Sequence, residues 1–205
     1  MNPNLPSKLD RAVAAANPAE RVVEIAAVIA EALRAVGRNP VLVGGAAVEF
    51  YTRGGYSTSD LDFIADGGQD VVKVMRELGF ERIGKDFVDR RRDIYIEFPS
   101  SSLGADEKWN EIDVGGVPVR IISCEDLVVD RLCAYKFWKS AIDGVNAVLL
   151  IEMNALNEER LLRAAKRERV ADALKAVRDV REEVIRKKLP APAANQLIEK
   201  KMRSL

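Results

Sequence analysis

Histidine is absent from this chain of 205 residues. Without an imidazole there is no histidine general base, no Ser-His-Asp triad, no HExxH zinc site and no HD-type phosphohydrolase centre. Cysteine is nearly absent too: Cys124 and Cys133 stand apart with no CxxC pair, so neither a disulfide framework nor a zinc site is indicated. The sequence therefore excludes several large classes of hydrolase and metalloenzyme.

An excess of charge of either sign is also lacking, because Lys plus Arg and Asp plus Glu both total 32. No global field favours a nucleic acid or a membrane, so any such contact must come from a local patch. No apolar run approaches the roughly 18 residues of a membrane span, and no N-terminal stretch has the apolar core of a signal peptide. We therefore expect a cytoplasmic protein with no membrane partner.

A glycine turn followed by two carboxylates is the most informative feature that the sequence does contain. Val41–Val43 predicts a short buried strand, Gly44 and Gly45 break it, and Ala46–Tyr51 predicts a helix. A helix that opens directly after the glycines offers free backbone N–H groups and the positive end of its dipole. The turn is thus a candidate anion site.

Asp60 and Asp62 lie on the next predicted strand, Leu61–Ala65 with its preceding acid. Side chains two positions apart on a strand share a face, so both carboxylates project together while Leu61 and Phe63 point to the other side. Two acids on one face repel each other unless a cation lies between them. The alternative is a structural turn whose aspartates cap it or face solvent, but their place inside an apolar strand favours a metal site.

This order of motifs resembles the nucleotidyltransferase superfamily typified by DNA polymerase beta, in which a Gly-Gly or Gly-Ser turn precedes an acid-x-acid strand. The matching residues here are Gly44, Gly45, Asp60 and Asp62. The closer likeness is to the small bacterial and archaeal members, which include the nucleotidyltransferases of toxin–antitoxin pairs. The chain departs from the pattern at Ala46, where many members have Ser, and at Tyr56, near a position often occupied by Arg.

The resemblance implies an α/β (α+β) fold: a mixed β-sheet flanked by helices in residues 1–122, followed by a helical region in residues 123–205. It further implies that Asp60 and Asp62 hold Mg²⁺, or Mn²⁺ in its place. The implied reaction moves a nucleoside monophosphate from an NTP, either ATP or GTP, to an acceptor hydroxyl and releases pyrophosphate. The acceptor is left open between a protein side chain, a tRNA end and a small hydroxylated molecule.

A two-metal site needs a third carboxylate from a neighbouring strand. The run Asp93–Phe98 alternates, which predicts that Ile94, Ile96 and Phe98 face the core. Glu97 lies on the opposite face and is the candidate third acid, although the family usually has Asp there. Asp93, beside three arginines, is the reserve candidate, and an exposed strand acid is the structural alternative.

Phosphate contacts are expected from several further positions. In the loop before the acids and in the glycine turn these are Gly44, Gly45, Arg53, Ser57 and Thr58. In the predicted helices after Ser123 the resemblance adds Arg131, Lys136, Lys139 and Asp143, either as phosphate contacts or as bracing residues. A basic residue on an amphipathic helix is, however, more often solvated than functional.

The remaining pattern predicts further helices at 18–36 and 70–78, and strands at 80–83, 87–89, 93–98, 111–114 and 117–122. Residues 157–188 are predicted to form one long helix, or two broken near Arg169, and 197–205 a last short helix. The narrow apolar stripe of 157–188 also suits pairing with a second chain, either as a homodimer or with an antitoxin. A catalytically inactive binding module of the same fold is the alternative function.

Overall fold

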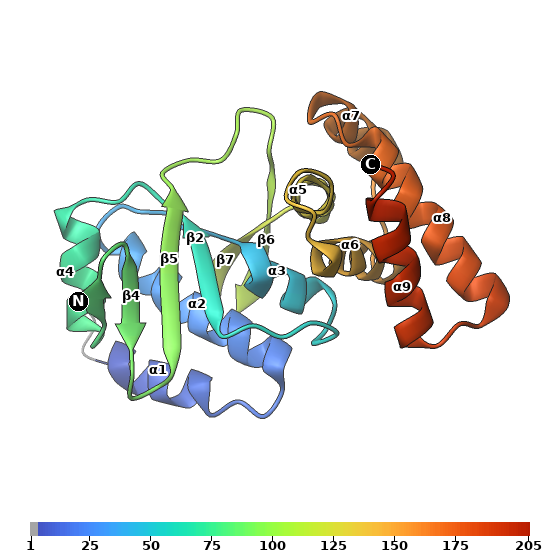
Figure 1. Ribbon diagram of the computed structural model, residues 1–205. Helices are drawn as coiled ribbons and strands as arrows, with labels where there is room; N and C mark the ends of the chain where they lie inside the picture. Colours follow the sequence, from blue (N-terminus) through green and yellow to red (C-terminus); the bar gives the residue numbers. More distant parts are fainter. Residues whose placement is uncertain (1–3) are drawn as a thin grey trace. The chain divides into compact units, whose positions relative to one another are not determined.

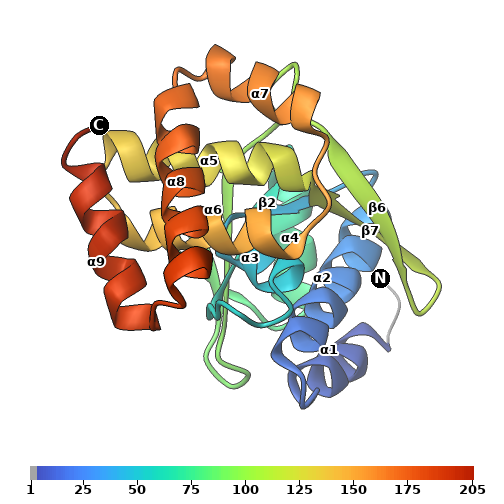
Figure 2. The ribbon, with the colours of Figure 1, turned by 90° about the vertical axis from the view of Figure 1, so that its right-hand side faces the viewer.

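The structure is a computed structural model that describes residues 4–205. The chain divides into two compact units, the first ending at Ser123 and the second comprising Cys124–Leu205. Figure 1 and Figure 2 show the ribbon in two views.

A mixed sheet forms the centre of the first unit. Its strand order is β3-β4-β5-β2-β1-β7-β6. The strands are β1 (Val41–Val43), β2 (Asp60–Ile64), β3 (Glu81–Ile83), β4 (Asp86–Asp89), β5 (Ile94–Ser100), β6 (Trp109–Val114) and β7 (Val117–Ile122). β1 is parallel to β7 and β2 is parallel to β5, whereas the other neighbours are antiparallel. The glycine turn and all the predicted acids therefore belong to the three central strands β1, β2 and β5 or to their ends.

The buried face of the sheet follows the predicted alternation. Leu61 and Phe63 in β2, and Ile94 and Ile96 in β5, are each at most 4% exposed. Phe98 is only half-buried, although its ring packs against that of Phe63. The prediction of a mixed sheet flanked by helices is confirmed.

The helices of the first unit are α1 (Leu5–Val13), α2 (Pro18–Arg34), α3 (Gly44–Tyr51) and α4 (Gln69–Glu77). α2 starts where predicted, because the Asn17 side chain accepts from the backbone N–H groups of Ala19 and Glu20 and Pro18 takes the first helical position. In Figure 1, α2 passes behind the strands.

α1 was not predicted, since its sequence is polar and contains proline. It is nevertheless strongly amphipathic: Leu5, Leu9 and Ala12 recur on one face and are at most 2% exposed. Pro6 lies in its first turn, where a missing N–H costs nothing. The spacing of these three apolar residues indicates the helix, whereas the overall polar composition of the segment does not.

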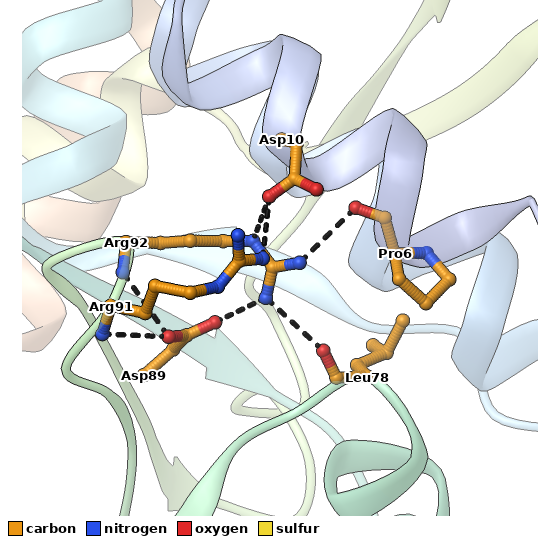
Figure 3. A network of polar contacts seen from close by, with 6 residues as sticks. All are labelled: Pro6, Asp10, Leu78, Asp89, Arg91 and Arg92. Atoms are coloured by element: carbon orange, nitrogen blue, oxygen red, sulfur yellow. Dashed lines mark hydrogen bonds and ion pairs between the residues drawn. The ribbon is translucent and has the colours of Figure 1, made fainter.

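A cluster of ion pairs fixes α1 to the β4–β5 connection, as Figure 3 shows. We call it the arginine network: Asp10, Asp89, Arg91 and Arg92. The Arg92 guanidinium donates to Asp10 at 2.7 Å, to Asp89, and to the backbone oxygens of Pro6 and Leu78. Arg91 donates to the same Asp10 oxygen at 2.6 Å. The Arg92 and Asp89 side chains are only 6% and 4% exposed, so the centre of the network is a buried ion pair, whereas Arg91 and Asp10 lie at the surface, 67% and 47% exposed.

The second unit is helical. It contains α5 (Cys124–Phe137), α6 (Ala141–Met153), α7 (Glu158–Arg167), α8 (Ala171–Lys187) and α9 (Ala191–Met202). The charged region breaks at Arg169, whose φ of 60° cannot continue a helix. The second of the two predicted alternatives is therefore the one found.

The last helix differs from the prediction. It begins at Ala191 rather than near Leu197, with Pro190 as its N-cap and Pro192 in its first turn. Proline is tolerated at a helix start, so this pair opens α9 in addition to ending α8. The apolar stripe predicted for pairing with a second chain is largely buried within the unit, at Leu161, Val170, Leu174, Val177 and Val180.

Across residues 4–205, no helix combines the length and the apolar character that crossing a bilayer requires.

Candidate active site

The glycine turn touches the acid strand directly. α3 begins at Gly44, immediately after β1, and its N-cap residue Val43 supplies no side-chain cap. Gly44 has a φ of +62°, and a Cβ built there would lie 2.0 Å from the Asp62 Oδ2 atom. Only glycine satisfies both the left-handed backbone and the missing space. The carboxylate of Asp62 therefore lies against the start of α3.

The second glycine lies under the loop that leads to the acids. A Cβ on Gly45 would lie 3.3 Å from the Thr58 side chain and from the Tyr56 ring. Thr58 also accepts a hydrogen bond from the backbone N–H of Asp60 at 3.2 Å. The structure thus brings the predicted phosphate-contact residue Thr58 to the glycine turn, with Tyr56 beside it.

The other predicted loop residues are more open. Ser57 is exposed next to Thr58. Arg53 is exposed in the turn after α3, where it adopts a left-handed φ of 51°. Both belong to the connection between α3 and β2 that passes over Gly45.

Glu49 is a site residue that sequence reasoning missed. It lies on α3, is 2% exposed, and accepts a 2.9 Å hydrogen bond from the backbone N–H of Thr58. Burial raises the pKa of its carboxyl group, while the Thr58 N–H and the charge of Arg21 act in the opposite direction. Glu49 therefore ties the loop before Asp60 to the helix that starts at the glycine turn. Its signal in the sequence was a lone carboxylate among the apolar residues of α3.

The strand register places the three predicted acids on one face. Asp62 is the register partner of Val43 on one side and of Glu97 on the other, and Asp60 is the partner of Tyr95. Partner residues in neighbouring strands share a face, as do residues two apart. Asp60, Asp62 and Glu97 therefore project from the same side of the sheet, opposite the buried face that holds Leu61 and Phe63.

Lys85, in the turn between β3 and β4, forms an ion pair with Glu97. Its hydrogen bond to Glu97, then the charge of Glu97, and further the charges of Asp86 and Asp62, raise the pKa of Lys85. The ammonium group thus lies within the field of Asp62 as well. No sequence pattern indicates this pairing, because Lys85 stands in a turn, twelve positions before Glu97.

Asp60 and Asp62 alone fit a metal ion better than a set of three acids that includes Glu97. Among residues 4–205, no group of three or more His, Cys, Asp or Glu side chains is placed to hold a metal ion. Mg²⁺ is commonly bound by one or two carboxylates together with substrate phosphates. Asp60 and Asp62, beside the glycine turn, fit that donor set, whereas Glu97 is engaged by Lys85. The reserve candidate Asp93 is exposed in the turn before β5, with a φ of 53°.

The candidate residues of the second unit have partners of their own there. Arg131 binds Asp143 at 2.8 Å and also pairs with Asp130. Lys136 donates to Asp172 at 2.7 Å and to the backbone oxygen of Arg169 at 2.9 Å, so it joins α5 to the start of α8. These contacts brace the helices of the unit.

Lys139 lies in the turn between α5 and α6, where it is exposed and has a φ of 54°. The phosphate role assigned to Lys136 and Lys139 stays a prediction.

Comparison with solved structures shows which known fold the chain resembles. No family model and no curated protein sequence matches this chain. Its structure is similar to the crystal structure of an antigenic nucleotidyltransferase-like protein from Paracoccidioides brasiliensis, with a TM-score of 0.54 and 15% sequence identity. The match covers 76% of this chain and 92% of that one. The chain has a nucleotidyltransferase-like fold.

Proposed function

We propose that this protein is a metal-dependent nucleotidyltransferase. It transfers a nucleoside monophosphate from ATP or GTP to an acceptor hydroxyl and releases pyrophosphate. The observation that supports this most strongly is the close approach of Gly44 to Asp62, which sets an uncapped helix start beside a pair of carboxylates. An anion and its counter-cation are the ligands that these two neighbours favour together.

Each part of the site has a separate task in this reaction. Asp60 and Asp62 would hold Mg²⁺, or Mn²⁺ in its place; when bound, the ion neutralises triphosphate charge and stabilises the transition state. The N–H groups that open α3 receive phosphate oxygens, because Gly44 and Gly45 place no side chain in the way. Thr58, held by Glu49, supplies a hydroxyl at the edge of the same turn.

The acceptor hydroxyl attacks the α-phosphorus in line with the leaving pyrophosphate. This arrangement needs no histidine, which agrees with the composition of the chain. A protein side chain, a tRNA end and a small hydroxylated molecule stay the three acceptor classes to screen.

A second candidate function is a nucleotide-binding or partner-binding module that has lost catalysis. The pairing of Glu97 with Lys85 favours it, because a third acid held by a lysine does not complete a two-metal site. In the second unit Phe137, Trp138 and Ile142 are 54%, 83% and 55% exposed, which offers apolar surface to a partner chain such as an antitoxin or a second copy.

Asp62→Asn separates these functions by a binding measurement and an activity measurement. Without Mg²⁺ we expect it to melt at the same temperature as the parent or higher, because one of two repelling carboxylates becomes neutral. With Mg²⁺ and NTP the parent gains stability, roughly 2.7 kcal/mol when ligand is at about a hundred times its dissociation constant. The variant should lose most of this gain, and pyrophosphate release with it.

Glu81→Gln is the matched control, since Glu81 is an exposed carboxylate on the same sheet. It should keep both the Mg²⁺-dependent gain and the pyrophosphate release. A parent that binds NTP but releases no pyrophosphate with any acceptor class supports the binding module. Strong destabilisation of metal-free Asp62→Asn would show that Asp62 is a structural residue and would contradict the proposed metal site.

A further inference from the structure

A second cavity of the first unit, of about 440 Å³, is lined by the start of α4, the β3–β4 hairpin and the end of β5. It lies on the face of the sheet opposite the predicted acids. Phe98 lines it and follows Glu97 along β5, so the two side chains point to opposite faces, and the Phe98 ring centroid lies 6.2 Å from that of the buried Phe63. Cavities of this size take small organic molecules. This cavity is therefore separate from the candidate active site.

One wall of the cavity is aromatic. The alternation in β5 predicts Phe98 in the core, yet its side chain is only half-buried and lines the cavity. The buried ring of Phe87 meets it edge to face, with the centroids 5.7 Å apart and the ring planes at 87°. Phe98 is thus a ring that its neighbours hold in place and that stays partly open. Such a ring favours contact with a second aromatic ring.

The free charge at the cavity is positive and comes from Arg82 in β3. Arg82 is the register partner of Phe87, so its side chain emerges on the same face as the aromatic wall. Its Nε atom donates to the backbone oxygen of Gly84 at 3.1 Å, which orients the guanidinium group. No carboxylate among residues 4–205 pairs with it. Its terminal N–H groups match the oxygens of a carboxylate or a phosphate.

The other charges at the cavity have partners within the chain. Lys85 also lines the cavity, but its ammonium group pairs with a carboxylate of β5. The Asp70 carboxylate lies against the start of α4, since a Cβ built on Gly68 would lie 2.4 Å from its Oδ1 atom, and it pairs with Arg38 at 3.0 Å. The helix start is thus already taken by an anion of the chain. Arg82 is the group that is left to bind an anion from solution.

We propose that this cavity binds a small aromatic anion, with the ring of the ligand against Phe98 and its carboxylate or phosphate on Arg82. The wall alone would accept any apolar molecule, and the arginine alone any anion. Together they select a molecule that carries both groups. The inference goes beyond the proposed function and does not rest on it, because the acids of the candidate active site project from the other face of the sheet.

The test measures binding of phenyl phosphate, without Mg²⁺ or NTP, by the shifts of backbone amide signals in nuclear magnetic resonance spectra. We expect saturable shifts at Gly67, Gly68 and Phe98. Inorganic phosphate lacks the ring and should bind roughly two- to tenfold more weakly than phenyl phosphate. Phenol lacks the charge and should bind roughly tenfold more weakly or less still.

Two variants divide the site into its parts. Arg82→Gln should weaken binding of phenyl phosphate roughly tenfold, because a hydrogen-bonded charge is lost. Phe98→Leu keeps an apolar side chain but removes the ring, and should weaken binding roughly two- to tenfold. Arg76→Gln is the matched control: it removes an exposed arginine of α4 that does not line the cavity, and it should leave the affinity unchanged.

Several results would overturn the proposal. Shifts confined to Gly44 and Gly45 would mean that the probe binds only at the glycine turn. Equal losses in Arg82→Gln and Arg76→Gln would show a general attraction of charge, and equal affinities for phenyl phosphate and inorganic phosphate would remove the aromatic part of the site. Asp62→Asn should bind the probe as the parent does, so that this proposal and the proposed function fail separately.

Discussion

Two charged clusters of the first unit use their charges in opposite ways. In the arginine network two arginines face two aspartates, and the central pair, Arg92 and Asp89, is almost completely buried. The second cluster, which we call the acid row, comprises Asp62 in β2, Glu97 in β5 and Asp86 in β4, which share one face of the sheet. The exposed Lys85 pairs with Glu97. In the network each arginine pairs with an aspartate around a buried centre, whereas the ion pair of the row, between Lys85 and Glu97, lies largely open to solvent.

The difference in burial follows from the difference in pairing. A buried charge is tolerated when its partner and further hydrogen bonds satisfy it, as the backbone oxygens of Leu78 and Pro6 do for Arg92. The hydrogen bond from Arg92 also lowers the pKa of Asp10 and keeps it ionised. In the row Glu97 is 30% exposed, and its partner Lys85 is 75% exposed. We infer that the network serves the fold and that the row serves a ligand.

The largest expected effect comes from leaving the buried Asp89 of the network without its cation. Arg92→Met removes the cation and leaves Asp89 buried without its partner, which should cost about 3–5 kcal/mol of unfolding free energy in urea titrations. Neighbouring Arg90 is exposed, so Arg90→Met should change the free energy by less than about 0.5 kcal/mol.

The orphaned charge of Asp89 can be removed in turn. The Asp89 side chain accepts hydrogen bonds from the backbone N–H groups of Arg91 and Arg92, at 3.0 and 3.1 Å. Asp89→Asn keeps a side-chain oxygen that can accept both. Combined with Arg92→Met it should recover part of the lost stability. A loss below about 1 kcal/mol for Arg92→Met would contradict the structural role of the network.

Periodicity and turn residues were enough to predict most of the sheet. β1, β2, β5 and β7 carry clear apolar patterns, and glycines or prolines mark their ends. The shared face of Asp60 and Asp62 followed from strand geometry alone. These features depend on neighbours in sequence, which a single chain reveals.

The unpredicted features depend on neighbours in space. Lys85 meets Glu97 only because β4 pairs with β5, and Arg92 meets Asp10 across 82 positions. Glu49 reaches Thr58 through the path of a loop. The sequence pattern made Glu97 a candidate third metal ligand. It could not predict the ion pair with Lys85, because a lysine in a turn is most often solvated.

The next effect tests the contact that joins the glycine turn to the acids. Gly44→Ala should destabilise the protein in two ways: a left-handed backbone costs about 1–2 kcal/mol for a residue with a Cβ, and that Cβ displaces the Asp62 carboxylate. Gly37→Ala is the matched control, because Gly37 also has a positive φ, of +77°, and a Cβ there would have no atom within 4 Å.

We therefore expect urea unfolding to show a larger loss for Gly44→Ala than for Gly37→Ala. In an Asp62→Ala background the excess should disappear, since the displaced group is gone. Equal losses in the two glycine variants of the parent would mean that Asp62 moves freely, and the close approach would lose its weight in the functional argument.

The smallest effect concerns Glu49, a buried carboxyl group whose first perturbing influence is burial rather than a partner. Because burial raises its pKa above the usual 4.5, the folded protein binds this proton more readily than the unfolded chain. The corresponding stability is present below pH 4.5 and is lost as the pH rises through the raised value.

Glu49→Gln can still accept a hydrogen bond from the Thr58 N–H but carries no charge. Its unfolding free energy relative to the parent should thus increase with pH above about 4.5 and then level off. Exposed Glu24 on α2 provides the control, as Glu24→Gln should show no such rise. If Glu49→Gln is instead less stable than the parent at pH 7, the ionised carboxylate itself holds the loop, and Glu49 belongs with the paired charges of the network.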